Sequence, residues 1–138
     1  MLSVEECRTE GNLAFRYYNP NPCGLKVGDC AIRALCKATD KPWEEIYADL
    51  AVLGFQMCDM PSANSVWGAY LRRQGFYREN VTDKCPECNT LEKFCDKHPK
   101  GLFVVAVKSH VVTVKDGNIY DTWNSSTESP LYYFRRNE

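Results

Sequence analysis

The sequence predicts an α+β domain in which N-terminal helices pack on a C-terminal antiparallel β-sheet. Between positions 30 and 98, apolar residues recur at the three- and four-residue spacing of helices. From Leu102 onward, short runs of β-branched and aromatic residues follow one another, as they do in strands. Asp116-Gly117 separates two of these runs and is a strong signal for a two-residue hairpin. Helices first and strands afterwards are typical of the α+β class.

The helices are bounded by recognisable start and stop residues. They are expected over residues 30–38, 42–53, 62–74 and 91–98. Pro42 suits a first helical turn, Gly54 is expected to end the second helix, and Gly75 is expected to cap the third. Thr90 is a favourable N-cap for the fourth helix.

Strands are expected over residues 76–77, 102–107, 111–114, 119–123 and 131–134, and residues 15–29 are expected to form a loop. No internal repeat, low-complexity tract or flexible linker divides the chain, so residues 1–138 are expected to form a single domain.

Composition excludes several classes of function. The formal net charge of −1 and the lack of a basic stripe do not favour nucleic acid or an anionic membrane as a partner. No apolar stretch approaches the roughly 20 residues that span a bilayer, and the acidic start of the chain lacks a signal-peptide core. We therefore expect a cytoplasmic protein. In that compartment, eight cysteines indicate metal binding or catalysis more than disulfides. Nothing in the sequence indicates an oligomeric state.

Cys30 differs from the other cysteines in its setting. It follows the turn-forming pair Gly28-Asp29 and directly precedes a strong helical run, which places its thiol at a helix N-terminus. The helix dipole and the free N–H groups of the first turn favour a thiolate there, and the thiolate is the nucleophilic form. Cys30 is therefore the predicted nucleophile, although a buried core thiol is the structural alternative.

The chain has only two histidines, which narrows the search for a base. His98 falls on the inward face of a predicted helix, whereas His110 opens a strand, where a cleft is common. A histidine beside Cys30 could hold the thiol as a thiolate and later protonate the leaving group. His110 is the predicted partner; the alternative is that it only fills a strand end.

Hairpin geometry supplies a third group. A type I′ turn at Asp116-Gly117 places Asp121 on the same face as His110 and diagonally from it, about 7–8 Å away between backbones. A carboxylate there could accept the Nδ1 proton of His110, so that Nε2 faces the sulfur. A one-residue change of register would bring Asn124 into this place instead. Asp121 is preferred and Asn124 is the reserve.

An oxyanion hole needs at least two donors. The backbone N–H of Cys30 is one, because it has no intrahelical partner. The side-chain amides of Asn19 and Asn21, in the preceding loop, are the predicted candidates for the other, although this loop is also explained by turn chemistry.

These pieces resemble the papain-like cysteine peptidase superfamily, and most closely its small bacterial or phage members and bacteriocin-processing peptidase domains. The resemblance rests on Gly28-Asp29-Cys30-Ala31, His110-Val111-Val112 and Tyr120-Asp121, and it covers about residues 15–125. It implies a helix-plus-antiparallel-sheet fold and cleavage of peptide or isopeptide bonds through a thioester. The superfamily usually has an oxyanion-hole glutamine about six residues before the cysteine, where this chain has Gly24, so Asn19 or Asn21 would have to substitute.

A second constellation has the spacing of a metal site. Cys85, Cys88, Cys95 and His98 form the string C-x₂-C-x₆-C-x₂-H, a suitable ligand set for tetrahedral zinc. Such an ion would be structural, because four protein ligands leave no open position, and catalysis would need no cofactor. The alternative is that Cys95 and His98 are core residues beside Leu91 and Phe94.

Three functions follow from these features. The first is a thiol hydrolase, most simply a peptidase, that acts on a peptide or protein through Cys30, His110 and Asp121. The second is a non-catalytic module on the same scaffold, stabilised by zinc, that binds a peptide or partner protein. The third is a related acyl transferase or amidase that acts on something other than protein.

Overall fold

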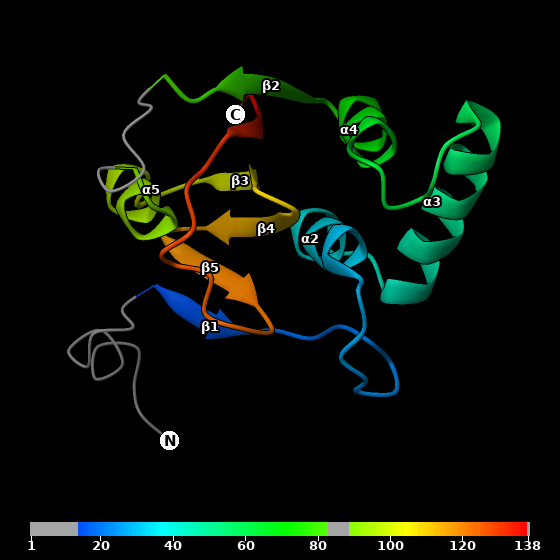
Figure 1. The fold of residues 1–138 in the computed structure, drawn as a ribbon, viewed down its shortest axis with the longest axis horizontal. Helices are drawn as coiled ribbons and strands as arrows, with labels where there is room; N and C mark the ends of the chain where they lie inside the picture. Colours follow the sequence, from blue (N-terminus) through cyan, green and yellow to red (C-terminus); the bar gives the residue numbers. More distant parts are fainter. Residues whose placement is uncertain (1–13, 83–88, 138) are drawn as a thin grey trace.

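The computed structural model describes residues 14–82 and 89–137 and has a mixed α+β fold (Figure 1). Its helices are α2 (Cys30–Thr39), α3 (Trp43–Met57), α4 (Asn64–Arg73) and α5 (Leu91–Lys97). Its strands are β1 (Phe15–Tyr17), β2 (Phe76–Asn80), β3 (Leu102–Val107), β4 (His110–Lys115), β5 (Asn118–Asp121) and β6 (Tyr132–Arg136). The α+β prediction is therefore confirmed.

The six strands form one sheet in the order β1-β5-β4-β3-β6-β2. As Figure 1 shows, α5 lies on one side of this sheet and α2 on the other, with α4 and α3 beyond α2. Each pair of neighbouring strands from β5 through β4, β3 and β6 to β2 is antiparallel, as expected. The expectation of a loop at residues 15–17 was wrong, because these residues form β1, which pairs in parallel with β5 at the sheet edge. The sheet is therefore mixed.

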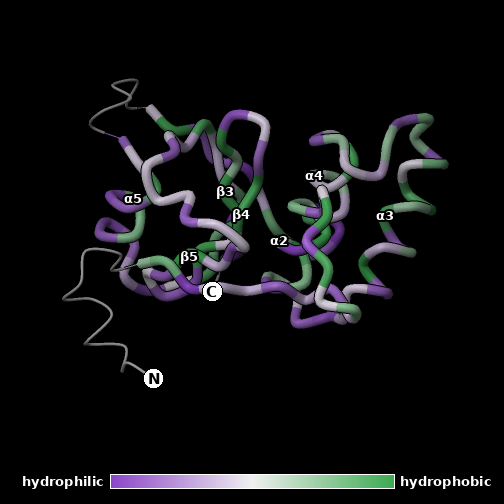
Figure 2. Tube along the Cα trace, turned by 60° about the horizontal axis from the view of Figure 1, so that its bottom comes forward, coloured by the Kyte–Doolittle hydropathy of each residue, from purple (hydrophilic) through white to green (hydrophobic). Residues whose placement is uncertain are grey.

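Side chains of the central strands alternate between two apolar clusters. Val104 and Ala106 of β3 pack with α2, whereas Phe103, Val105 and Val107 pack with Leu91 and Phe94 of α5. This alternation follows from the two-residue period of a strand, and both faces of β3 are covered. Figure 2 shows the resulting concentration of hydrophobic residues along β3 and β4.

Helix α2 is held close against the sheet. Its inner face carries Ala31, Ala34, Leu35 and Ala38, all buried, and the small alanines allow the helix backbone to approach the strands. The buried hydroxyl of Thr113 in β4 donates to the Ala34 carbonyl at 2.6 Å. This bond fixes the distance between helix and sheet, and so the position of residue 30 relative to the start of β4.

Helix α3 extends beyond Gly54, where the sequence predicted its end. Gly54 does not end it; the helix continues to Met57, and Cys58 adopts the left-handed cap conformation instead. Gly54 allows a close approach: a Cβ there would lie 2.9 Å from the Asp59 carbonyl oxygen and 3.1 Å from the Pro61 nitrogen. Across residues 14–82 and 89–137, no helix combines the length and apolarity needed to cross a bilayer.

We predict that Thr113→Val lowers the free energy of unfolding by about 1–2 kcal/mol, because the helix-to-sheet hydrogen bond is lost inside the core. Chemical denaturation measures this change. Thr127→Val, at an exposed position, is the matched control and should stay within about 0.5 kcal/mol of the parent. Equal stability of the two variants would contradict this role for Thr113.

Candidate active site

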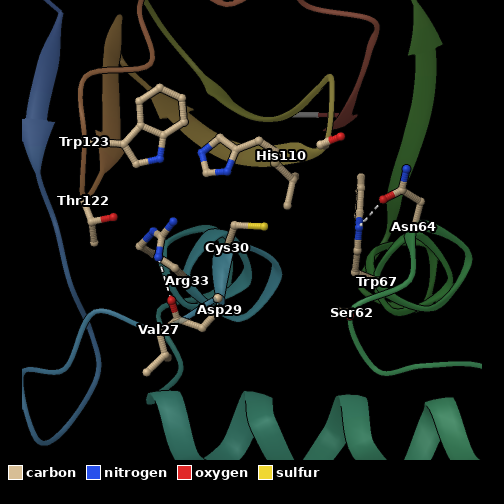
Figure 3. Close-up of a pocket in the computed structure, with 13 residues that line it drawn as sticks. Val27, Asp29, Cys30, Arg33, Ser62, Asn64, Trp67, His110, Thr122 and Trp123 are labelled. Atoms are coloured by element: carbon tan, nitrogen blue, oxygen red, sulfur yellow. Dashed lines mark hydrogen bonds and ion pairs between the residues drawn. The ribbon is translucent and has the colours of Figure 1, made fainter.

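A cleft of about 530 Å³ opens where β4 begins and β5 ends, next to the start of α2. Cys30 and Asp29 lie on one wall, His110 and Trp123 on another, and Asn64 and Trp67 of α4 face them (Figure 3). The arrangement follows from the topology, because the last residue of β5 and the first of β4 meet at one end of an antiparallel pair. Residues far apart in the sequence thus share one cavity.

Cys30, His110 and Asp121 are brought together. His110 Nε2 lies 2.7 Å from Asp121 Oδ2, and Cys30 lines the same cleft, close enough to His110 for the imidazole to lower the pKa of its thiol. The hairpin register that placed Asp121 here is confirmed: Lys115 pairs with Asn118, and both turn residues have positive φ.

The roles expected for the two ring nitrogens were wrong. Nε2, not Nδ1, faces the Asp121 carboxylate, which leaves Nδ1 for the sulfur. The reason is reach: Asp121 lies on the neighbouring strand, so the ring nitrogen farther from the backbone meets it. Cys30 lines the cleft beside the start of β4, where the Val111 backbone also lowers the pKa of its thiol.

Asp121 is fully buried, and each of its carboxylate oxygens is satisfied twice. Oδ1 accepts from Arg33 at 3.1 Å and from the Thr122 backbone N–H at 2.8 Å. Oδ2 accepts from Ser125 Oγ at 2.8 Å and contacts His110 Nε2. Burial alone would raise the pKa of this carboxyl group, but the His110 hydrogen bond and charge and the other donors lower it below its ordinary value. Asp121 is therefore held as a carboxylate.

The pKa values of the other two groups shift toward an ion pair. Burial favours the neutral thiol of Cys30, yet the hydrogen bonds to His110 and Val111 and the charges of His110 and Arg33 lower its pKa. Burial also opposes a charged His110, but the hydrogen bonds to Asp121 and Cys30 raise its pKa to about 9. At neutral pH the imidazole is thus protonated beside a thiol that readily ionises.

A second cysteine on the same helix shows how much the setting matters. Cys36 is buried in the apolar cluster beside α2, and burial, together with the charges of Asp29 and Glu44, raises its pKa to about 12. Cys36 is therefore an unreactive core thiol at neutral pH.

Arg33 connects the start of α2 to the sheet. Its guanidinium donates to Asp29 Oδ1 at 2.7 Å and to Asp121 Oδ1 at 3.1 Å, and the arginine is almost entirely buried. Trp43 Nε1 donates to the other Asp29 oxygen at 2.8 Å. Sequence reasoning missed Asp29, Arg33 and Ser125 as site residues. Asp29 and Arg33 are four positions apart and lie on either side of Cys30. An acidic and a basic residue at this spacing more often form a solvent-exposed ion pair on the surface of a helix, so the spacing alone did not indicate a site.

The same network leaves the amides of the first helical turn uncapped. Asp29 precedes α2 but makes no side-chain capping bond, because its carboxylate is bound to Arg33 and Trp43. The first backbone N–H groups of the helix, including that of Cys30, therefore keep their donor capacity next to the cleft.

Asn19 and Asn21 are not brought to this cleft. Asn19 Nδ2 donates to the Leu25 carbonyl, and Asn21 Oδ1 accepts from the backbone N–H groups of Cys23 and Leu25. Both amides thus stabilise turns of the loop before α2. Asn64 lines the cleft instead, and its Oδ1 accepts from Trp67 Nε1 at 3.0 Å, which leaves the Nδ2 group as a donor. No sequence signal pointed to Asn64. The reserve residue Asn124 is exposed, and its Oδ1 accepts from the Ser126 backbone.

The predicted zinc ligands are only partly described. Cys85 and Cys88 lie outside the described residues. Cys95 is buried in the cluster under α5, and His98 stacks on Phe94 with ring centroids 4.1 Å apart. His98 Nδ1 lies 2.9 Å from the Phe94 carbonyl oxygen, so a metal would have to use Nε2. Residues 14–82 and 89–137 contain no group of three metal-ligating side chains. Zinc stays a prediction.

We predict that Arg33→Met lowers the free energy of unfolding by about 3–5 kcal/mol, because it leaves the carboxylates of Asp29 and Asp121 buried without their shared partner. Urea denaturation measures this loss. The exposed Arg73→Met should change stability by less than about 0.5 kcal/mol. Similar values for both variants would show that Arg33 does not bridge the two acids.

A second prediction concerns the charge on His110. Asp121→Asn removes the carboxylate that stabilises the imidazolium, so the pKa of His110 should fall from about 9 toward its ordinary value. Titration of the ring resonances by NMR measures the shift. Asp96→Asn, on the exposed side of α5, should leave this pKa unchanged. An unchanged titration in Asp121→Asn would contradict the His110–Asp121 coupling.

Comparison with known proteins found no relative. No protein-family model matches the chain, and neither a curated protein nor a solved structure does. Its function therefore has to be inferred from the side chains of the cleft themselves.

Proposed function

We propose that the protein is a thiol hydrolase that cleaves peptide or isopeptide bonds, with Cys30 as nucleophile, His110 as acid and base, and Asp121 as the residue that orients the imidazole. The observation that carries the proposal is the convergence in one cleft of Cys30, at the start of α2, and His110, which is bound to the buried Asp121 carboxylate and lowers the pKa of the thiol. A core cysteine needs no such partners.

The groups suit both halves of an acyl transfer. The Cys30 thiolate adds to the substrate carbonyl carbon, the C–N bond breaks, and the leaving amine takes a proton from the His110 imidazolium. The neutral imidazole then takes a proton from water, and the hydroxide attacks the thioester. The C–S bond breaks, the carboxylic acid leaves, and the thiolate–imidazolium pair is restored.

The negative charge that develops on the carbonyl oxygen needs hydrogen-bond donors during both steps. The free N–H of Cys30 at the start of α2 suits this role, since α2 directs its N-terminal dipole to the same place. The Asn64 amide, across the cleft, is our candidate for the second donor in place of Asn19 or Asn21. The order of elements, with a cysteine helix first and histidine and aspartate strands later, supports a papain-like ancestry as part of this proposal.

The experiment that tests the proposal is labelling by iodoacetamide as a function of pH. Cys30 should be alkylated below pH 7 much faster than the exposed Cys23 and Cys58, which serve as internal references. His110→Ala should abolish this preference, because it removes the main groups that lower the Cys30 pKa. Mass spectrometry of the digested protein locates the label. Equal labelling of all exposed thiols would sink the proposal and would favour the non-catalytic binding module.

Hydrolysis should show a bell-shaped dependence of kcat/KM on pH. The acid limb reports the Cys30 thiol and should lie below the ordinary thiol pKa, because the thiolate is stabilised. The alkaline limb should lie near pH 9, where His110 loses the proton that the leaving amine needs. Turnover of a fluorogenic peptide measures both limbs, and a rate that keeps rising above pH 9 would contradict the acid role of His110.

A further inference from the structure

A second, smaller pocket adjoins the cleft, and neither Cys30 nor His110 lines it. Its volume is about 230 Å³, several times the roughly 30 Å³ that one water molecule occupies in the liquid. It shares Gly28, Asp29 and Ser62 with the main cleft. The pocket therefore borders the cleft at the residues that directly precede Cys30.

The wall of this pocket is largely apolar. Ala31, Ile32 and Ala51 contribute aliphatic surface, and Pro61 and the Tyr47 ring complete it. The one carboxylate in the lining, Asp29, has both oxygens bound by Arg33 and Trp43. Its charge is thus compensated within the protein and does not favour a cationic guest over an apolar one.

Two contacts hold the pocket in shape. The close approach of Gly54 to Asp59 and Pro61 keeps Pro61 against α3. The Tyr47 ring packs on Trp43 with centroids 5.1 Å apart, and Trp43 is itself hydrogen-bonded to Asp29. A pocket of this kind exists before a ligand arrives, so little free energy is spent in forming it.

The position of the pocket tells which part of a substrate would enter it. The leaving amine must lie near His110, which protonates it, and His110 and Trp123 line only the main cleft. In Figure 3, His110 and Trp123 lie on one side of Cys30, while Val27, Asp29 and Ser62 lie toward the other. The group attached to the carbonyl on the acyl side then points toward Gly28 and Ala31, and so into the second pocket.

We propose that this pocket binds an apolar side chain on the residue that supplies the scissile carbonyl. The proposal rests on the proposed thiol-hydrolase function and names its substrate class: peptides cleaved after a residue of about leucine to phenylalanine size. One missing apolar group in such a pocket costs about 10–200-fold in kcat/KM.

Peptidyl chloromethyl ketones test this directly. The Cys30 sulfur displaces chloride, so that a C–S bond forms, the C–Cl bond breaks and chloride leaves. We would compare acetyl-glycyl probes that carry leucine, phenylalanine, glycine or aspartate next to the ketone. The second-order rate constants for leucine and phenylalanine should exceed those for glycine and aspartate by at least about tenfold.

Two variants and a matched control link the preference to the pocket. Ala51→Phe fills the pocket and should reduce the leucine-to-glycine ratio to about one, while the rate with iodoacetamide stays unchanged. Ala48→Phe places the same ring at an exposed position of the same helix and should keep the parent ratio. Tyr47→Ala removes an exposed wall and should shift the preference toward phenylalanine.

The outcomes separate the two proposals. If Cys30 reacts selectively with iodoacetamide but the four probes react equally, or Ala51→Phe keeps the preference, the pocket proposal is overturned and the hydrolase proposal stands. If Cys30 reacts no faster than Cys23 and Cys58, the hydrolase proposal fails, and the pocket proposal fails with it.

Discussion

The buried carboxylate of Asp121 is the group on which the site depends. A buried carboxylate is tolerated only where hydrogen-bond donors of the protein replace water. Asp121 has four such donors. Each donor comes from a different place: helix α2, the start of β4, and two positions after β5. One carboxylate therefore fixes the helix, the histidine and the following loop relative to one another, and its charge keeps the imidazole protonated.

Arg33 extends this constraint to Cys30, the proposed nucleophile. Its guanidinium spans Asp121 on the sheet and Asp29 at the start of the helix, so the residue before Cys30 is tied to the residue that orients His110. Because Asp29 is used in this way, it does not cap α2, and the helix presents uncapped amides to the cleft. The same salt-bridge network thus positions the thiol and leaves free the groups that would stabilise an oxyanion.

Local chemistry predicted much of the fold. The helical run after Gly28-Asp29 marked α2, Thr90 was correctly identified as the cap of α5, and Asp116-Gly117 set the hairpin register. These signals act over a few residues, where backbone preference and side-chain period decide the outcome. Gly54 was wrongly expected to end its helix, because its role is a close contact with residues 59–61. Strand β1 was missed because three residues at a sheet edge are too few to show the alternating pattern of a strand.

The sequence by itself determined which residues could do chemistry: an activated position for Cys30, one histidine on a strand, and an aspartate placed beside it by a two-residue turn. Only the tertiary structure decided how they are joined. Arg33 meets Asp121 across 88 positions of the chain, His110 uses Nε2 for its acid, and the pocket beside Cys30 combines α2, α3 and the segment before α4. Such contacts arise from how elements pack, and no local preference encodes which distant side chain will fill a given place.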